Sequence, residues 1–189
     1  MSWINRIAPE DAPPELRAIH ERIRAQSASQ SVAHLWQAWG AHPAGLEATF
    51  ATYRALMDDP APLTPAQAEM IALVVSANNG CAYCVAHHGA KLARLVGEEL
   101  ARDVARDYRG ANLAARDRVL LDAALALNCE PAERTCTDIE RLREYGFDDA
   151  GILRAVEIAA FYAYVNRVAM AIGVELEPRL KPWVFGAQF

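Results

Sequence analysis

Residues 64–96 read TPAQAEMIALVVSANNGCAYCVAHHGAKLARLV, and the fold of the chain can be predicted outward from this stretch. Its first residue, Thr64, carries a hydroxyl that is suited to cap the N-terminus of a helix. Pro65 then stands at the first helical position and Gln67 three residues after the cap, which is the pattern of a capping box. The sequence therefore predicts that a helix begins at Thr64.

The apolar run at 70–77 indicates that this helix is buried. It should end at residues 78–80, Asn-Asn-Gly, because asparagine and glycine tolerate the left-handed conformation of a helix C-terminus. A second helix is expected to begin close to Cys81 and to run to Val96, with Gly97 as its stop. Two helices joined by so short a turn run antiparallel, so we expect a helix hairpin over 64–96 at the centre of the fold.

Helix-forming residues dominate the rest of the chain, and no segment alternates apolar and polar residues as a half-buried strand would. Chain-breaking residues divide it into these expected helices: 14–25, 32–40 and 43–57 before the hairpin, and 115–127, 137–145 and 148–172 after it. Thr137 and Glu140 are expected to form a second capping box. We predict one all-α domain over 1–189, a helical bundle with N-terminal helices in 14–57, C-terminal helices in 115–172 and an irregular tail at 174–189.

Composition narrows the classes of function. The chain has 189 residues, 53% of them hydrophobic, and a net charge of −5, which excludes disorder and gives no general attraction to nucleic acid. The longest apolar runs are far shorter than the ~18 residues that a membrane-spanning helix needs. The first residues carry charge and proline where a signal peptide would be apolar. We therefore expect a soluble, cytoplasmic protein with no nucleic-acid or membrane partner.

Four cysteines are too few for a disulfide scaffold, and in a reducing compartment a close pair is more often catalytic or metal-binding than structural. Cys81 and Cys84 form such a pair, a C-x-x-C. Cys129 and Cys136 stand at a spacing that fits no motif, and we interpret them as small buried hydrophobic residues.

Cys81, Cys84 and His88 are spaced to lie on one face of the second hairpin helix. Thiols three residues apart can form a reversible disulfide, and the positive end of the helix dipole favours a thiolate there. His88, one turn beyond Cys84, can exchange a proton with it or with a bridging water. Glu69 stands in the middle of the apolar helix, where burying a carboxylate is costly unless a partner uses it. Facing His88, it would orient the imidazole.

Plainer interpretations stay open for the same residues. Zinc is disfavoured, because a structural site wants four ligands and the fourth would have to come from the distant Cys129 or Cys136. Glu69 could instead face solvent at the edge of its helix. His87 points about 100° away from His88 around the helix, which favours a packed or interfacial histidine. Spacing alone does not choose which of the two thiols attacks.

The pattern Glu69-x11-Cys81-x-Tyr83-Cys84-x3-His88 resembles the active-site motif of the alkyl hydroperoxidase D / carboxymuconolactone decarboxylase-like superfamily. The wider chain, over most of 1–177, resembles the branch of uncharacterised peroxidase-related proteins. Three segments carry this wider resemblance: TYRALMDDPAPLTPAQAEMIALVVSANNGCAYCVAHH, RDRVLLDAALAL and FYAYVNRVAMAIGVELEP. It implies an all-α fold and a two-cysteine peroxidase chemistry that needs no cofactor. The decarboxylases of the superfamily lack the cysteine pair, so their lactone chemistry is not carried over.

The resemblance also implies roles for the motif residues. Cys84 corresponds to the thiol that attacks the peroxide, and Cys81 to the thiol that supplies a proton and then closes the disulfide. Glu69 and His88 correspond to the proton-relay pair. Tyr83 stands where the family admits histidine or tyrosine; its phenol can donate a hydrogen bond but is a poor base near neutral pH. Cys81, at the start of the helix, is expected to be the more exposed of the two thiols.

Three functions are compatible with these residues. The first is an enzyme, a thiol peroxidase that reduces hydroperoxides and is itself reduced by an unidentified thiol or lipoyl-protein partner. The second is a thiol–disulfide carrier for a protein or lipoyl partner, and the third a non-catalytic oligomeric binding protein. We also expect a homo-oligomer, a trimer or hexamer. The resemblance implies it, and Trp36, Trp39 and the apolar tail at 174–189 suggest exposed surfaces that need a partner.

Overall fold

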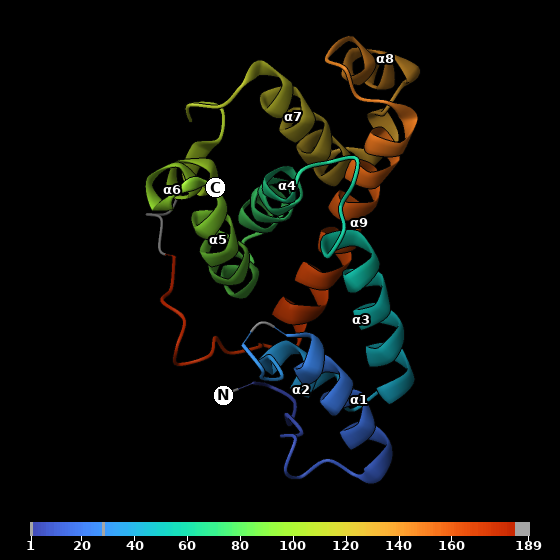
Figure 1. Cartoon of the computed structure of the whole chain (residues 1–189), viewed down its shortest axis with the longest axis vertical. Coiled ribbons are helices and arrows are strands. Elements are labelled where there is room, and N and C mark those ends of the chain that lie inside the picture. Colours follow the sequence, from blue (N-terminus) through green and yellow to red (C-terminus); the bar gives the residue numbers. More distant parts are fainter. Residues whose placement is uncertain (1, 28, 184–189) are drawn as a thin grey trace.

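The computed structural model describes residues 2–27 and 29–183, and within them every regular element is a helix, so the predicted all-α class is confirmed (Figure 1). The α-helices are α1 Pro14–Gln26, α2 His34–Trp39, α3 Pro43–Met57, α4 Pro65–Asn78, α5 Ala82–Val96, α6 Glu98–Asp107, α7 Ala115–Cys129, α8 Cys136–Glu144 and α9 Asp149–Ala171. One 3₁₀ turn, η1, spans Pro131–Glu133. None of these described helices is long and apolar enough to cross a bilayer.

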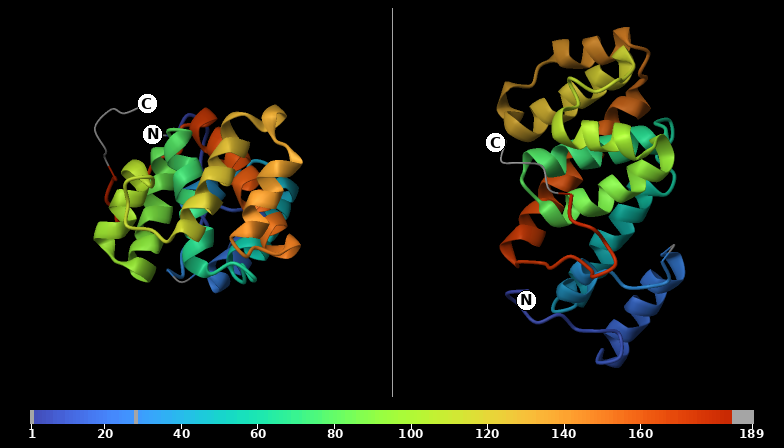
Figure 2. Two further views of the ribbon diagram at one scale, coloured as in Figure 1. Left: turned by 90° about the horizontal axis from the view of Figure 1, so that it is seen from above. Right: turned by 90° about the vertical axis from the view of Figure 1, so that its left-hand side faces the viewer.

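Helix α4 lies at the centre of the molecule, with α5, α6, α7 and α9 packed around it (Figures 1 and 2). An unbroken run from Gln67 to Ser76 is buried, which fits a helix that is apolar on all its faces. Helices α1 to α3 extend the molecule at one end and α7 and α8 at the other, so it is elongated (Figure 2). The α4–α5 hairpin is therefore surrounded by other helices, and groups on its inner faces are shielded from water.

The start of α4 is capped as the sequence predicts. The Thr64 hydroxyl accepts a hydrogen bond from the Gln67 backbone N–H, and the Gln67 side chain accepts one from the Thr64 N–H. The left-handed residue of the α4–α5 turn is Gly80, with φ of 71°. After it, the Cys81 N–H donates to the Ser76 carbonyl at 2.9 Å, which folds the start of α5 back onto the end of α4.

One local prediction was confirmed but incomplete, and one was wrong. Gly97 ends α5, but with φ of 91° it leads directly into α6, a helix that we did not expect. Glu98 and Glu99 in its first turn are the signal that could have revealed it, since acidic residues favour a helix N-terminus. The capping box of α8 uses Thr135 and Asp138, not Thr137 and Glu140, because the chain is still extended at Thr135.

The surfaces expected to need a partner are mostly covered by the chain itself. Trp36 and Trp39 are only 9% and 8% exposed. Trp36 packs against Phe50 and Tyr53 of α3, and Trp39 against a tyrosine of α9. They therefore do not form the exposed patch that we inferred from sequence.

The described part of the tail, residues 174–183, also lies on its own chain, running past α2 and α5 (Figure 2). The Trp183 ring lies so close to Gly89 of α5 that a Cβ there would be 2.6 Å from it. The remaining apolar tail residues, Val184, Phe185 and Phe189, lie outside the described residues.

Candidate active site

Cys81 and Cys84 meet at the start of α5, as the C-x-x-C spacing predicts. Their sulfur atoms are 2.7 Å apart, and both residues are free cysteines. Cys81 is the residue that caps α5, and Cys84 lies one turn inside it. The helix therefore presents two thiols to each other where its dipole favours negative charge.

Both sulfurs are buried, which corrects one prediction. Cys81 is 1% exposed and Cys84 3%, so Cys81 is not the more accessible thiol. The turn that returns the Cys81 N–H to Ser76 holds this residue against α4 instead of at the surface. Cys84, by contrast, lines a cavity.

The pair shares its protons. The hydrogen bond between the sulfurs lowers the pKa of one thiol, Cys81, and, together with burial, raises that of the other, Cys84, because once one thiol has ionised the second stays protonated to donate to it. The Asn166 side chain of α9, which donates to the Ser76 hydroxyl at 3.0 Å, lies near the pair and lowers the pKa of each thiol. When the pair loses one proton, the hydrogen bond stabilises the charge that remains, and a proton moved across 2.7 Å changes which sulfur carries it.

Glu69 of α4 is buried and faces His88, so it does not point to solvent. Its Oε2 is 2.6 Å from the His88 Nδ1, and the Lys91 Nζ is 3.6 Å from its Oε1. Lys91 in turn donates to the Tyr53 hydroxyl of α3 at 2.7 Å. The buried carboxylate therefore has an imidazole on one oxygen and a cation near the other.

The surroundings of Glu69 and His88 determine the charge that each carries. Burial raises the pKa of Glu69, but His88 and Lys91 outweigh it and hold that pKa below its usual value. Burial also lowers the pKa of His88, and Glu69 offsets this only in part. The imidazole is accordingly neutral near pH 7. With Nδ1–H donated to Glu69, its Nε2 is the nitrogen that can accept a proton.

A second cluster forms around Glu177, in the tail. The Tyr83 hydroxyl donates to its Oε1 at 3.0 Å, and the His87 Nε2 is 2.7 Å from its Oε2. The backbone N–H of His34 also donates to Oε1, at 2.7 Å. Burial raises the pKa of Glu177, but these hydrogen bonds, with His87 first, lower it to about 2. Tyr83 also accepts from the Leu35 N–H, and burial keeps its own pKa well above the usual value.

The cavity beside Cys84 has a volume of about 70 Å³. Aromatic side chains form much of its wall, and the chemically active groups that line it include Cys84, His88 and Lys91. The Tyr162 ring meets His88 edge-on, with ring centroids 4.5 Å apart. The cavity thus brings a thiol, a neutral imidazole and a small volume of enclosed space together.

Sequence reasoning missed four residues of this arrangement: Tyr53, Lys91, Asn166 and Glu177. Lys91 follows His88 by three residues, so its helical spacing could have revealed it. The other three come from α3, α9 and the tail, and nothing local in the sequence indicates their contact with the hairpin. Cys129 and Cys136 are exposed rather than buried, which corrects our interpretation of them.

Comparison with known proteins places the chain among relatives with this architecture. The model of the carboxymuconolactone decarboxylase family matches residues 43–106. An uncharacterised peroxidase-related protein with an alkylhydroperoxidase AhpD core, from Ralstonia eutropha JMP134, is 31% identical, with a TM-score of 0.84 over 94% of this chain and 93% of its own. One from Silicibacter sp. TM1040 is 34% identical, with a TM-score of 0.80 over 88% and 86%. A search of curated protein sequences returned no match.

The fold and the buried cysteine pair define a helical protein of the AhpD-like class. With its full-length similarity to the two peroxidase-related proteins, the chain belongs to the alkylhydroperoxidase AhpD / carboxymuconolactone decarboxylase-like superfamily. The debrominase Bmp8 also shares the fold, with a TM-score of 0.77 over 93% of this chain and 92% of its own, at 18% identity. That likeness concerns the fold alone.

The Glu177 cluster predicts a pH-dependent stability. The pKa of Glu177 is depressed when folded, so its contribution is present above the pKa of the unfolded chain and is lost as pH falls toward about 2. We expect Glu177→Gln to lower the free energy of unfolding near pH 7, and the difference from wild type to shrink as pH falls from about 5 to about 2. Urea unfolding at a series of pH values measures this. Glu175→Gln, in the same segment, is the control. A difference that does not change with pH would contradict the prediction.

Proposed function

We propose that this protein is a two-cysteine thiol peroxidase, which reduces hydroperoxides through a sulfenic acid and a disulfide. The observation that carries the proposal is the pair of buried sulfurs, 2.7 Å apart, of which Cys84 shares a small cavity with the neutral His88. Membership of a superfamily with peroxidase-related members supports the same chemistry.

In the first step the Cys84 thiolate attacks the outer oxygen of the hydroperoxide. The O–O bond breaks, a sulfur–oxygen bond forms, and the leaving alkoxide takes a proton to become an alcohol. Cys84 is then a sulfenic acid. In the second step the Cys81 sulfur attacks the Cys84 sulfur, a disulfide forms, and the oxygen leaves as water. Two electrons have passed from the dithiol to the peroxide.

The position of Cys84 at the cavity supports giving it the first step, although the thiol with the lowered pKa is Cys81. Cys84 faces the cavity, and Cys81 is held behind it. Because the two sulfurs share a hydrogen bond, a charge resting on Cys81 reaches Cys84 when one proton crosses between them. The thiol that carries the charge at rest can therefore be Cys81 while the thiol that attacks the peroxide is Cys84.

His88 and Glu69 move the protons. Neutral His88 accepts a proton from the dithiol through Nε2, and Glu69 stabilises the imidazolium that results, since it is already hydrogen-bonded to Nδ1. His88 then supplies that proton to the leaving oxygen. Tyr83, whose raised pKa keeps it neutral, is a wall of the cavity and not a base.

The burial of both sulfurs bears on the alternatives. A folded protein partner cannot bring its own disulfide to sulfurs that are 1% and 3% exposed, which argues against a thiol–disulfide carrier for folded proteins. The reductant that completes the cycle is, for the same reason, a slender dithiol, either small or borne on a lipoyl arm. A non-catalytic binding protein has no use for a buried Glu–His pair beside a dithiol. The cycle needs a reducing compartment, in keeping with a cytoplasmic location.

We also propose that the protein is a homo-oligomer, at least a trimer. Several large apolar side chains of α9 are exposed, with Leu153 at 58%, Tyr164 at 49% and Met170 at 37%. They are spaced along the length of the helix, and exposed apolar side chains of this size are candidates for subunit contacts.

The order of the two cysteines can be tested by mass. One equivalent of hydroperoxide should convert the reduced wild type to the disulfide, with loss of two hydrogens. Cys81→Ser should instead accumulate a sulfenic acid on Cys84, which a dimedone probe captures, and Cys84→Ser should form none. Cys129→Ser, at an exposed cysteine, is the control and should behave as wild type. If Cys84→Ser forms a sulfenic acid on Cys81 at the wild-type rate, then Cys81 is the attacking thiol and the proposed order is wrong.

The proton relay can be tested at Glu69. Glu69→Gln keeps the shape and an acceptor for His88 but removes the charge that stabilises the imidazolium, so oxidation of the dithiol should slow by ~10²–10⁴-fold. Stopped-flow fluorescence of the reduced protein, over a range of pH, measures the rate. Glu157→Gln, on the surface of α9, is the matched control. A rate within a factor of about two of wild type would remove Glu69 from the mechanism.

The oligomer prediction is checked by sedimentation. At micromolar concentration we expect a mass at least about three times that of the 20.7 kDa chain, and Leu153→Glu should dissociate the assembly because it places a charge in the contact. Arg24→Glu, at an exposed position on α1, is the comparison and should leave the assembly intact. A wild-type species of 20.7 kDa would refute the prediction.

A further inference from the structure

A second cavity adjoins the one beside Cys84. Its volume is about 370 Å³, and Trp36, Tyr53, His87 and Lys91 line both spaces. Ligand pockets typically measure ~300–1,000 Å³. The inner cavity, at about 70 Å³, falls well below that range, and the outer one lies within it. A substrate larger than a small peroxide must therefore place its reacting end in the inner cavity and its body in the outer one.

The outer cavity carries a local excess of positive charge. Four of its lining residues are cationic, Arg54, Lys91, Arg94 and Arg179, and one is acidic, Asp58. This contrasts with the net charge of −5 of the whole chain, so overall composition does not account for it. Arg54 pairs with Asp58, and Lys91 with Glu69 and Tyr53.

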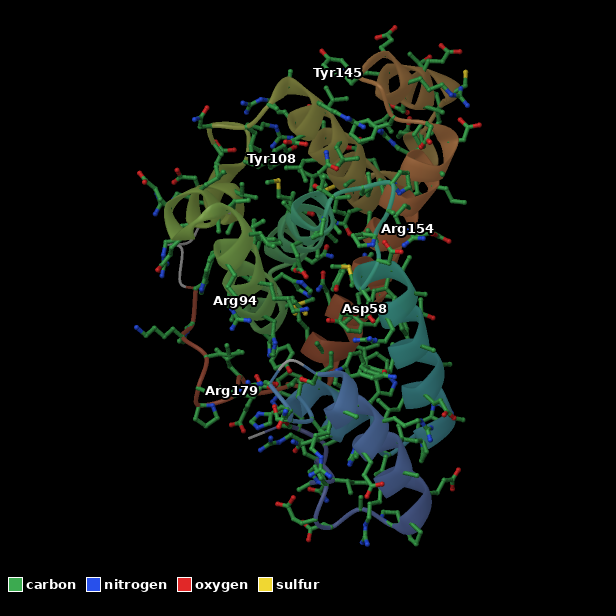
Figure 3. All side chains as sticks on the ribbon, viewed as in Figure 1. Asp58, Arg94, Tyr108, Tyr145, Arg154 and Arg179 are labelled. Atoms are coloured by element: carbon green, nitrogen blue, oxygen red, sulfur yellow. The ribbon has the colours of Figure 1, made fainter. Side chains whose placement is uncertain are left out.

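Arg94 and Arg179 differ from the other two cations. Arg94 lies on α5, two turns beyond His87, and Arg179 lies on the tail. Both are labelled in Figure 3. Within the part of the chain that the structure describes, neither has an acidic side chain as an ion-pair partner. Two guanidinium groups from separate segments thus line one cavity with no carboxylate of their own to bind.

From these observations, and resting on the proposed peroxidase activity, we infer that the physiological substrate is an anionic hydroperoxide. Its hydroperoxide end reaches Cys84, and its carboxylate or phosphate group lies in the outer cavity between Arg94 and Arg179. Guanidinium groups bind both anions with paired hydrogen bonds, so the shared chemistry is an oxyanion. The apolar rings of Trp36 and Tyr53, between the two ends, contact the carbon chain that joins them.

The redox step of this substrate is the one already described. Its O–O bond breaks, the outer oxygen passes to the Cys84 sulfur, and the hydroxy acid or hydroxy phosphate leaves as product. The anionic group takes no part in the electron transfer. Its effect is to raise the occupancy of the site, so it should appear in the apparent second-order rate constant at low substrate concentration.

The test compares a short-chain hydroperoxy carboxylic acid with its methyl ester, which differ in charge and little else. Stopped-flow fluorescence of the reduced protein gives a rate constant for each. In the wild type the acid should react at least about tenfold faster than the ester. In Arg94→Gln/Arg179→Gln the ratio should approach one, and added salt should reduce it in the wild type. Arg167→Gln, at an exposed arginine of α9 away from the cavities, should keep the wild-type ratio.

A binding measurement keeps this inference separate from the proposed activity. Titration calorimetry of the reduced protein with the hydroxy acid product, and with a hydroxyalkyl phosphate of the same length, tells carboxylate from phosphate without any turnover. Binding lost in the double variant supports the site. Acid and ester that oxidise the dithiol equally would overturn the anion site and leave the peroxidase intact. If neither the acid nor the ester oxidises the dithiol, the proposed peroxidase activity is wrong. In that case the titrations test the anion site by themselves, and absence of product binding overturns it.

Discussion

A carboxylate buried in the middle of an apolar helix is the constraint on which the rest of the structure depends. Glu69 can stay charged there only because a hydrogen-bonding imidazole and a nearby ammonium group replace the water it has lost. Those partners come from α5, which fixes how the two hairpin helices face each other. Lys91 in turn needs the Tyr53 hydroxyl, which draws α3 against the hairpin. One charge thus sets the relative placement of three helices.

The same constraint separates two environments along α5. On the inner face, His88 is neutral and close to the buried acid. On the next face around the helix, His87 meets Glu177, a carboxylate supplied from the end of the chain. Adjacent histidines therefore lie against different carboxylates. The difference comes from the ~100° turn between neighbouring helix positions.

The hairpin could be predicted from sequence because its signals are local. Thr64 and Gln67 lie within one turn, and the spacing from Cys81 to His88 is a property of one helix. Contacts that join distant segments could not be predicted in this way. Asn166 of α9 donates to Ser76 beside the cysteines, and Glu177 of the tail accepts from Tyr83. Both contacts depend on packing that no sequence periodicity predicts. Gly97 misled us because a left-handed glycine ends one helix whether or not another follows it.

The placement of Glu177 has a consequence for the order in which the site is assembled during synthesis. The hairpin with its cysteines leaves the ribosome before the second half of the chain, and domains fold from the N-terminal side as they emerge. Glu177, which holds Tyr83 and His87 in place, and the Trp183 ring that covers Gly89 are made about 90 residues after the cysteines. A nascent chain therefore carries its dithiol without this wall until the segment from Glu177 to Trp183 has been made. The finished pocket exists only after that segment has folded back onto α5.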